Sequence, residues 1–280
     1  MRIGNIAGRA KVIVGEAHAV DIETASGGRF GSDPGELYDR WEQFRGWTPP
    51  ADAPVERFTR GDIGNPAPAP RQIFAIGLNY RDHAAESDMA VPPEPAVFTK
   101  FASSLAGPFT QVALPVGNVD WEVELVVVIG RGGRHIPATA AWRHVAGATV
   151  GQDLSERRLQ AVGPVPQFSL AKSHRGFGPI GPFLVTTDEL PDPDDLVLGC
   201  SLNGEQVQKS RTSHMIFPVP ELIARLSAVT ELWPGDVIFT GTPSGVGAGR
   251  TPQRFLAPGD ELVSSIDGVG EIRQTFVAVA

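Results

Sequence analysis

The chain has 280 residues, enough to bury a substantial core in one large domain or in a main domain with a small appendage. Its formal net charge is −8, from 32 acidic and 24 basic residues without a run of like charges, which argues against nucleic acid and membrane as partners. A single cysteine, Cys200, no secretory-signal pattern and no apolar run near the roughly 20 residues that span a bilayer predict a cytoplasmic protein without intramolecular disulfides.

Residues 1–70 differ in composition from the rest of the chain. A strand-like segment at residues 11–15 and a helix-like segment at residues 36–44 precede the closely spaced prolines Pro66, Pro68 and Pro70. Proline-rich segments of this kind are typical of linkers. We interpret residues 1–70 as a small N-terminal domain and linker, a structural or oligomerising cap without chemistry, and residues 71–280 as the main domain.

From residue 72 onward, short β-branched and aromatic segments alternate with Gly and Pro, which predicts a β-rich fold. The strands are expected at residues 73–77, 122–130, 147–151, 182–186, 197–203, 237–241 and 261–266. Asn203-Gly204 predicts a two-residue hairpin turn because both positions tolerate positive φ. One clear helix is expected after Pro220, where apolar residues recur with helical spacing and a proline in the first turn costs no hydrogen bond.

A histidine and a glutamate stand three positions apart soon after the first of these strands. In a helix, His83 and Glu86 would be neighbours on one face. A carboxylate beside an imidazole favours its basicity and fixes its tautomer, which is the arrangement that a water-activating base needs. The alternative is an incidental pair on a solvated helix face.

An acidic pair precedes the apolar run of residues 125–129. In a strand, Glu122 and Glu124 point to the same face, roughly 6.5 to 7 Å apart at Cα. That face continues with apolar residues, so the pair lies at the mouth of an apolar interior, where unpaired charge is costly without a cation. Asp153 ends another predicted strand and offers a third oxygen. These oxygen donors favour Mg²⁺, Mn²⁺ or Ca²⁺ over zinc. The alternative is that the two glutamates lie on an exposed edge strand, as an isolated Glu-x-Glu more often does.

From about residue 73 to residue 276 the chain resembles the fumarylacetoacetate hydrolase family, including its acylpyruvase and 2-hydroxyhepta-2,4-diene-1,7-dioate isomerase-like members. The resemblance rests on Gly77-Leu78-Asn79-Tyr80 with His83 and Glu86, on Phe98-Thr99-Lys100 and Ala171-Lys172-Ser173, and on residues 120–125, 153–160, 179–182 and 234–247. It implies a mixed β-sandwich roll of the β-rich α+β class and a biological unit of at least a dimer. We expect a homodimer.

The resemblance also implies roles for individual residues. It makes Glu122, Glu124 and Asp153 the ligands of a divalent cation, with Mg²⁺ expected and Mn²⁺ or Ca²⁺ as alternatives. It places His83 and Glu86 on a lid helix as the catalytic dyad. Lys172 would be an active-site cation that stabilises an enolate or an oxyanion.

Three further residues match family positions that contact the substrate. Arg157 and Gln160 match positions that contact substrate oxygens, and a guanidinium suits a carboxylate geometrically. Thr242 matches the residue that receives the substrate carboxylate through its hydroxyl and neighbouring backbone amides. Many relatives carry aspartate where this chain has Arg175, a departure that changes the local charge and leaves the substrate open.

The leading hypothesis is hydrolysis of a carbon–carbon bond in a 2,4-diketo acid, an acylpyruvate-like compound, through a metal-stabilised enolate. His83 and Glu86 would activate water, and Lys172 would help to hold the enolate before it protonates to a 2-keto acid. Without attack by water, the same site would serve an isomerase or tautomerase of a hydroxydienoate, or an oxaloacetate-type decarboxylase. A non-catalytic protein that binds a metal or a small acid is the alternative from another class, but it would need neither His83 nor Lys172.

Overall fold

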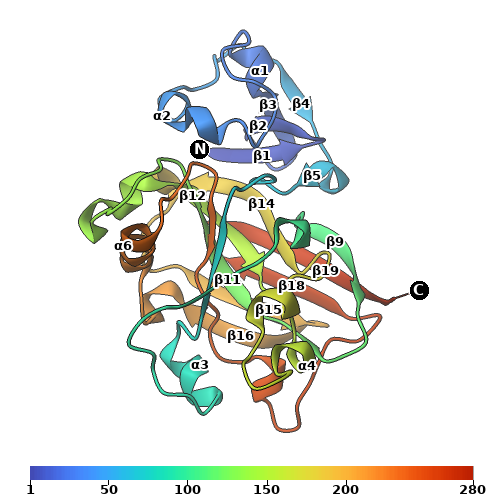
Figure 1. Ribbon diagram of the computed structural model, residues 1–280. Helices are drawn as coiled ribbons and strands as arrows, with labels where there is room; N and C mark the ends of the chain where they lie inside the picture. Colours follow the sequence, from blue (N-terminus) through green and yellow to red (C-terminus); the bar gives the residue numbers. More distant parts are fainter. Residues whose placement is uncertain (280) are drawn as a thin grey trace.

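The computed structural model describes residues 1–279, which form nineteen strands in three sheets together with short helices (Figure 1). The strands of the largest sheet are β1 Arg2–Ile6, β2 Arg9–Ile13, β3 His18–Asp21, β4 Val55–Arg57, β5 Ile63–Gly64, β6 Ile73–Gly77, β7 Ala96–Thr99, β8 Leu105–Ala106, β11 Val123–Ile129, β12 Val145–Gln152, β14 Gly178–Thr186 and β17 Val237–Phe239. A second sheet contains β9 Phe109–Leu114, β15 Val197–Leu202, β16 Glu205–Arg211, β18 Glu261–Ile266 and β19 Gly270–Ala278. The third pairs β10 Val119–Asp120 with β13 Ser155–Glu156.

The helices are short except for one. The α-helices are α1 Ile22–Ala25, α2 Trp41–Phe44, α3 Arg81–Glu86, α4 Arg157–Gln160, α5 Phe168–Ala171 and α6 Val219–Val229. The 3₁₀ turns are η1 Tyr38–Arg40, η2 Arg60–Asp62, η3 Ala102–Ser104, η4 Ala138–His144, η5 Thr187–Glu189, η6 Thr212–His214 and η7 Gly247–Gly249. No helix within residues 1–279 is long and apolar enough to cross a membrane.

The large sheet has the strand order β4-β3-β2-β1-β14-β12-β11-β17-β6-β7, and the second has the order β16-β15-β18-β19-β9. Most neighbouring strands are antiparallel, but β17 pairs with β6, β14 with β8 and β19 with β9 in parallel. The expected mixed, β-rich α+β fold is therefore confirmed.

Strand β11 separates two apolar cores. All seven of its residues are buried. Val123, Leu125 and Val127 pack in the core that β11 shares with the second sheet, whereas Val126 and Val128 pack in the core on the opposite face. A strand buried on both faces reads as a continuous apolar run, which is how this segment reads in the sequence. Since β11 lies between β12 and β17, the alternative of an exposed edge strand is wrong.

The seven strands predicted from residue 72 onward are all present. Those at residues 73–77 and 261–266 agree with β6 and β18 residue for residue. The turn between β15 and β16 has φ values of 53° at Asn203 and 82° at Gly204, as the hairpin prediction requires. Helix α6 carries Pro220 in its first turn and buries the expected apolar face. In the N-terminal segment, the strand expected at residues 11–15 begins two residues earlier, as β2.

The helix expected at residues 36–44 is wrong as a single element, because the chain forms η1 and then α2. The tertiary packing of aromatic rings explains the difference. In a 3₁₀ turn, side chains three positions apart lie one above the other. This places the Tyr38 and Trp41 rings in a stack with centroids 5.9 Å apart, and both rings are buried with Phe44.

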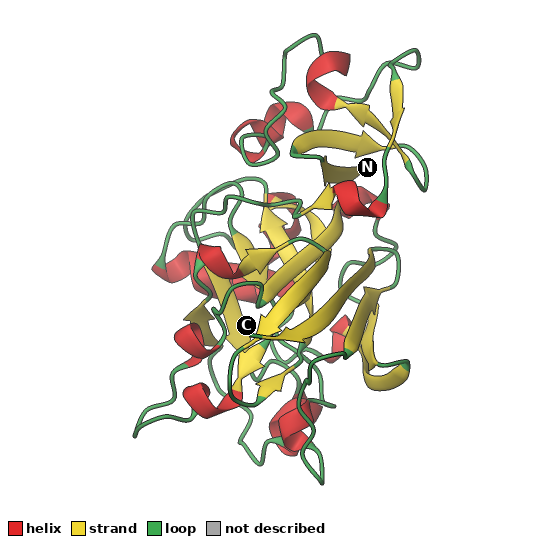
Figure 2. Cartoon of the chain, turned by 90° about the vertical axis from the view of Figure 1, so that its right-hand side faces the viewer, coloured by secondary structure: helices red, strands yellow, loops and turns green. Residues whose placement is uncertain are grey.

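Residues 1–65 lie at one end of the molecule and continue the large sheet (Figures 1 and 2). Strand β1 pairs with β14 through Arg2 and Val185, and the core on that face combines Ile3 and Phe44 with Phe239. The division at residue 70 into an N-terminal domain and a catalytic domain stays a prediction.

Candidate active site

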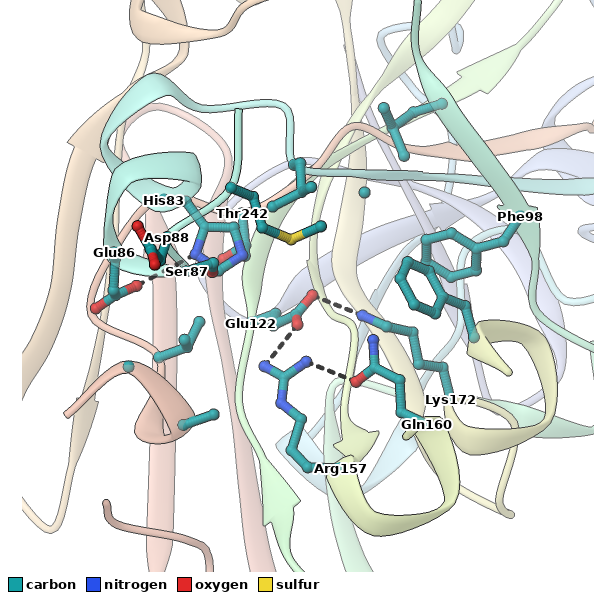
Figure 3. A pocket seen from close by; sticks show the side chains of 18 residues that line it. His83, Glu86, Ser87, Asp88, Phe98, Glu122, Arg157, Gln160, Lys172 and Thr242 are labelled. Carbon is teal, nitrogen blue, oxygen red and sulfur yellow. Dashed lines mark hydrogen bonds and ion pairs between the residues drawn. The ribbon is translucent and has the colours of Figure 1, made fainter. Parts of the chain in front are cut away.

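A cavity of about 390 Å³ opens beside β11 and gathers side chains from segments that are distant in the sequence (Figure 3). Helix α3, helix α4, the residue after α5 and the loop after β17 all contribute to its wall. Its lining includes seven of the residues singled out in the sequence: His83, Glu86, Glu122, Arg157, Gln160, Lys172 and Thr242.

The three predicted metal ligands lie together next to this cavity. Carboxylate oxygens of Glu122, Glu124 and Asp153 fall within 4.8 Å of one another, and each of these residues is buried. Strand pairing brings them together, because Glu124 lies opposite Gly151 and the Asp153 amide donates to the Glu122 carbonyl at 2.9 Å. Buried carboxylates this close repel each other, and a hard divalent cation with oxygen ligands would remove the conflict. The donor set therefore fits Mg²⁺, Mn²⁺ or Ca²⁺.

Lys172 bridges two of these carboxylates. Its Nζ lies 2.7 Å from Glu122 Oε2 and 2.7 Å from Asp153 Oδ2. Burial opposes a charge on Lys172, but Asp153 and Glu122 outweigh it and raise the lysine's pKa. Burial likewise opposes a charge on Glu122, but Lys172 and Arg157 hold the pKa of that carboxyl below its ordinary value. The amine thus occupies the side of the cluster that faces the cavity.

Glu124 lies deeper and has less compensation. Its Oε2 accepts a hydrogen bond from the Gly241 amide at 2.7 Å. Burial and the negative charges of Asp153 and Glu122 raise its pKa well above the ordinary value. In the absence of a cation, the cluster therefore favours a proton on this carboxyl.

Arg157 binds the other side of Glu122. Its Nη2 lies 2.8 Å from Glu122 Oε1, and its Nη1 donates to Gln160 Oε1 at 3.0 Å. Its Nε donates at 2.9 Å to Asp120, which also accepts the Gly247 amide at 2.7 Å. Arg157 is therefore held at the cavity wall by Asp120, Glu122 and Gln160, and its guanidinium and the Gln160 amide can meet substrate oxygens there.

The predicted dyad is present on α3. His83 Nδ1 lies 3.2 Å from Glu86 Oε2, and His83 lines the cavity. Glu86 is held in turn, because its Oε1 accepts the Gly245 amide at 2.9 Å. A side chain on Gly249 would bring a Cβ within 2.4 Å of Glu86 Cγ, so this glycine leaves the room that Glu86 needs. The pair orients the imidazole with Nε2 available for chemistry.

Thr242 lines the cavity and Arg175 does not. The Thr242 hydroxyl donates to the Val123 carbonyl at 2.9 Å and accepts from the Gln208 amide at 2.9 Å. Binding a substrate carboxylate through this hydroxyl would require it to leave the Val123 carbonyl. Arg175 is exposed and lines a different groove together with His174. Its positive charge therefore lies in that groove and not in the cavity.

Sequence reasoning missed two buried residues of the site, Asp120 and Lys100. Asp120 is fully buried and joins Arg157 to the loop after β17. Lys100 follows β7, and its Nζ lies 2.6 Å from Asp153 Oδ1 and also donates to the Lys172 carbonyl. Burial lowers the pKa of Lys100, although Asp153 opposes the shift. Both residues stand in motifs shared with the family, but Asp and Lys in isolation are usually solvated.

Comparison with known proteins identifies the family of this chain. The family model described as fumarylacetoacetate (FAA) hydrolase C-terminal matches residues 72–277. The human mitochondrial oxaloacetate tautomerase FAHD2A is 47% identical over 209 residues, which cover 74% of this chain and 67% of the relative. A crystal structure of a Mycobacterium smegmatis protein provisionally named HpcE is 61% identical with a TM-score of 0.95 and full coverage of both chains. Maleylpyruvate hydrolase from Sphingobium sp. SYK-6, solved with manganese(II) ion and pyruvate, is 29% identical with a TM-score of 0.83, again over 100% of both chains.

The fold and the site define a class of enzymes in which a sheet-rich α+β domain carries a buried acidic cluster beside a cavity. The chain belongs to the fumarylacetoacetate hydrolase family, as its motifs suggested. Tautomerases, isomerases and hydrolases are all found among its relatives.

Proposed function

We propose that this chain is a divalent-metal-dependent tautomerase that interconverts the keto and enol forms of an oxaloacetate-type 2-oxo acid. The observation that carries the proposal is the placement of His83 and Lys172 on opposite sides of Glu122, both facing one cavity (Figure 3). A proton acceptor and a cationic donor on two sides of one substrate are what enolisation needs. The tautomerase that is 47% identical supports the choice of reaction.

We assign separate roles in metal binding, substrate binding and proton transfer to the residues in and beside the cavity. When bound to Glu122, Glu124 and Asp153, the cation would act as a Lewis acid that polarises the 2-oxo group. Arg157 and Gln160 would hold the substrate carboxylate. His83 would take a proton from carbon 3 of the keto form, Lys172 would hydrogen-bond to the developing negative charge on the 2-oxo oxygen, and His83 would then deliver its proton to that oxygen.

The proposal is tested by following the enol absorbance of oxaloacetate with purified protein, with Mg²⁺, with Mn²⁺ and after chelation. A metal-dependent approach to the keto–enol equilibrium that is faster than the buffer-catalysed rate, without release of pyruvate, would support the tautomerase. Pyruvate release from oxaloacetate would instead indicate a decarboxylase. An unchanged rate of tautomerisation with every metal would contradict the proposal.

Hydrolysis of a 2,4-diketo acid is the second candidate, and the position of Glu86 favours it. Glu86 fixes His83 from behind and is itself held by Gly245, so the imidazole is oriented as a base for water. Maleylpyruvate hydrolase supports this chemistry at lower identity. Metal-dependent formation of pyruvate from acetylpyruvate would establish it, and the tautomerase assay with oxaloacetate separates the two candidates.

Assembly and location remain proposals. We expect a homodimer in the cytoplasm, with a small keto acid as the ligand. Analytical ultracentrifugation of the purified chain measures its oligomeric state directly. A monomer's sedimentation coefficient at micromolar concentration would contradict the homodimer.

A further inference from the structure

Lys100 is a buried lysine outside the cavity, next to the acidic cluster. Its side chain has 0% exposure, as does that of its partner Asp153. A lysine in such a place gives up its hydration, and the ion pair offsets this loss only when its geometry is good. The distance of 2.6 Å between Lys100 Nζ and Asp153 Oδ1 meets that condition.

The two oxygens of Asp153 have different partners. Oδ1 is bound by Lys100, and Oδ2 is bound by Lys172 at 2.7 Å. Lys172 lines the cavity, so a cation or a substrate can draw its amine away from Asp153. Lys100 does not line the cavity and stays on Oδ1. The pairing therefore leaves Oδ2 as the oxygen that Asp153 can offer to a cation.

A second contact links Lys100 to Lys172. The Lys100 amine also donates to the backbone carbonyl of Lys172, at the residue where α5 ends. The Lys100 amine thus holds both the Asp153 carboxylate and the backbone at Lys172, the residue whose side chain reaches the acidic cluster. Strand β14 leaves space for it, because a Cβ on Gly178 would lie 3.1 Å from Lys100 Cε.

We propose that Lys100 is a positioning residue that holds Asp153 with Oδ2 directed toward the other two carboxylates and anchors the backbone of Lys172. This inference rests on the proposed metal-dependent function. It assigns to Lys100 an effect on metal affinity through Asp153, because groups that orient a metal ligand commonly change affinity when they are removed. A purely structural ion pair would affect stability alone.

The test is Mn²⁺ binding to the full chain, measured from the electron paramagnetic resonance signal of free Mn²⁺, for wild type and Lys100→Met. We expect the variant to bind Mn²⁺ about 10- to 100-fold more weakly. The matched control is Lys11→Met, which removes another buried lysine, paired with Glu56 in the N-terminal strands. It should lower the melting temperature and leave Mn²⁺ affinity unchanged.

A second variant keeps the test decisive if Lys100→Met does not fold. Gly178→Ala displaces Lys100 Cε by a few tenths of an ångström without removing the amine, and we expect a smaller loss of affinity, about 3- to 10-fold. Wild-type Mn²⁺ affinity in a folded Lys100→Met protein, or an equal loss in Lys11→Met, would overturn the role of Lys100. Absence of Mn²⁺ binding by the wild type would instead overturn the proposed metal-dependent function together with this inference.

Discussion

Two clusters of charged side chains lie on or next to the large sheet, and they differ in burial and in how their charges are paired. In the N-terminal strands, Asp21 is paired with Arg9 and Glu56 with Lys11, and one member of each pair reaches solvent, as the exposures of 41% for Arg9 and 53% for Glu56 show. Beside the cavity, three carboxylates crowd within 4.8 Å, and every partner is largely buried.

The ion pairs of the N-terminal strands stabilise the fold, whereas the crowded carboxylates beside the cavity repel one another and destabilise it. A carboxylate with its own cation at the surface is satisfied without a ligand. In the acidic cluster, Lys172 is shared between Glu122 and Asp153, and the one donor to Glu124 among residues 1–279 is the Gly241 backbone amide. Groups held in such conflict are typical of functional sites. The first cluster should therefore respond to mutation in stability, and the second in activity and metal binding.

The largest effect is expected at the dyad. His83→Ala should lower kcat for oxaloacetate tautomerisation by about 10²- to 10⁴-fold, because it removes the acid–base group while the acidic cluster stays intact. Mn²⁺ affinity should not change. The exposed His18 on β3 offers a matched control, and His18→Ala should keep wild-type kcat. A kcat within threefold of wild type for His83→Ala would remove the histidine from the mechanism.

Glu124→Gln should separate stability from function. Without a cation, the repulsion from Asp153 and Glu122 favours a proton on this carboxyl, which is ionised in the unfolded chain near pH 7. Glutamine is neutral in both states and avoids the free-energy cost of that protonation, so the metal-free protein should melt about 2–4 °C higher at pH 7. Mn²⁺ affinity should fall by more than about 100-fold, because one of three anionic ligands is lost. Differential scanning fluorimetry with and without Mn²⁺ measures both. A lower melting temperature without metal would contradict the account of like-charge conflict.

Asp21→Asn should lower stability and leave metal binding unchanged. The hydrogen bonds from Arg9 hold the pKa of Asp21 well below its ordinary value, so the carboxylate stabilises the fold above the unfolded-state pKa of about 3.9 and loses this contribution as the pH falls through the folded-state pKa. The variant should melt about 2–4 °C lower at pH 7, and the difference from wild type should shrink toward pH 2. Mn²⁺ affinity should be unaffected. A pH-independent difference would show that the charge is not responsible.

The smallest effect is expected at Arg175. Since this side chain is exposed in a groove apart from the cavity, Arg175→Asp should leave kcat/KM within about a factor of 2. Arg157→Gln is the contrast, because it removes the guanidinium from the cavity wall and should raise KM. A large kinetic change at Arg175 would mean that the groove communicates with the site through the adjoining Lys172 segment.

The sequence predicted the parts of this site that follow from local pattern. The two-residue period of a strand brought Glu122 and Glu124 to one face, and the apolar run after them predicted a buried strand. The helical spacing of His83 and Glu86 predicted their contact, which the structure shows at 3.2 Å. The seven strands expected between residues 73 and 266 and the turn at Asn203 likewise follow from local composition.

What the sequence could not predict depends on contacts between distant segments. Lys100 and Asp153 are 53 positions apart, and only the folded sheet shows that the lysine is buried against the aspartate. Asp120 is an anchor only because the chain returns to it at Gly247. The break in the helix expected at residues 36–44 likewise follows from aromatic packing in the core and not from local preference.

The central claim is that the acidic cluster holds a divalent cation. The most direct test is anomalous diffraction at the manganese edge from crystals of the full chain grown with Mn²⁺. The account predicts one strong peak within coordination distance of Glu122, Glu124 and Asp153, with the Lys172 amine withdrawn from Asp153 Oδ2 and Lys100 still on Oδ1. Crystals with no peak at the cluster, and with Lys172 still bridging Glu122 and Asp153, would contradict it.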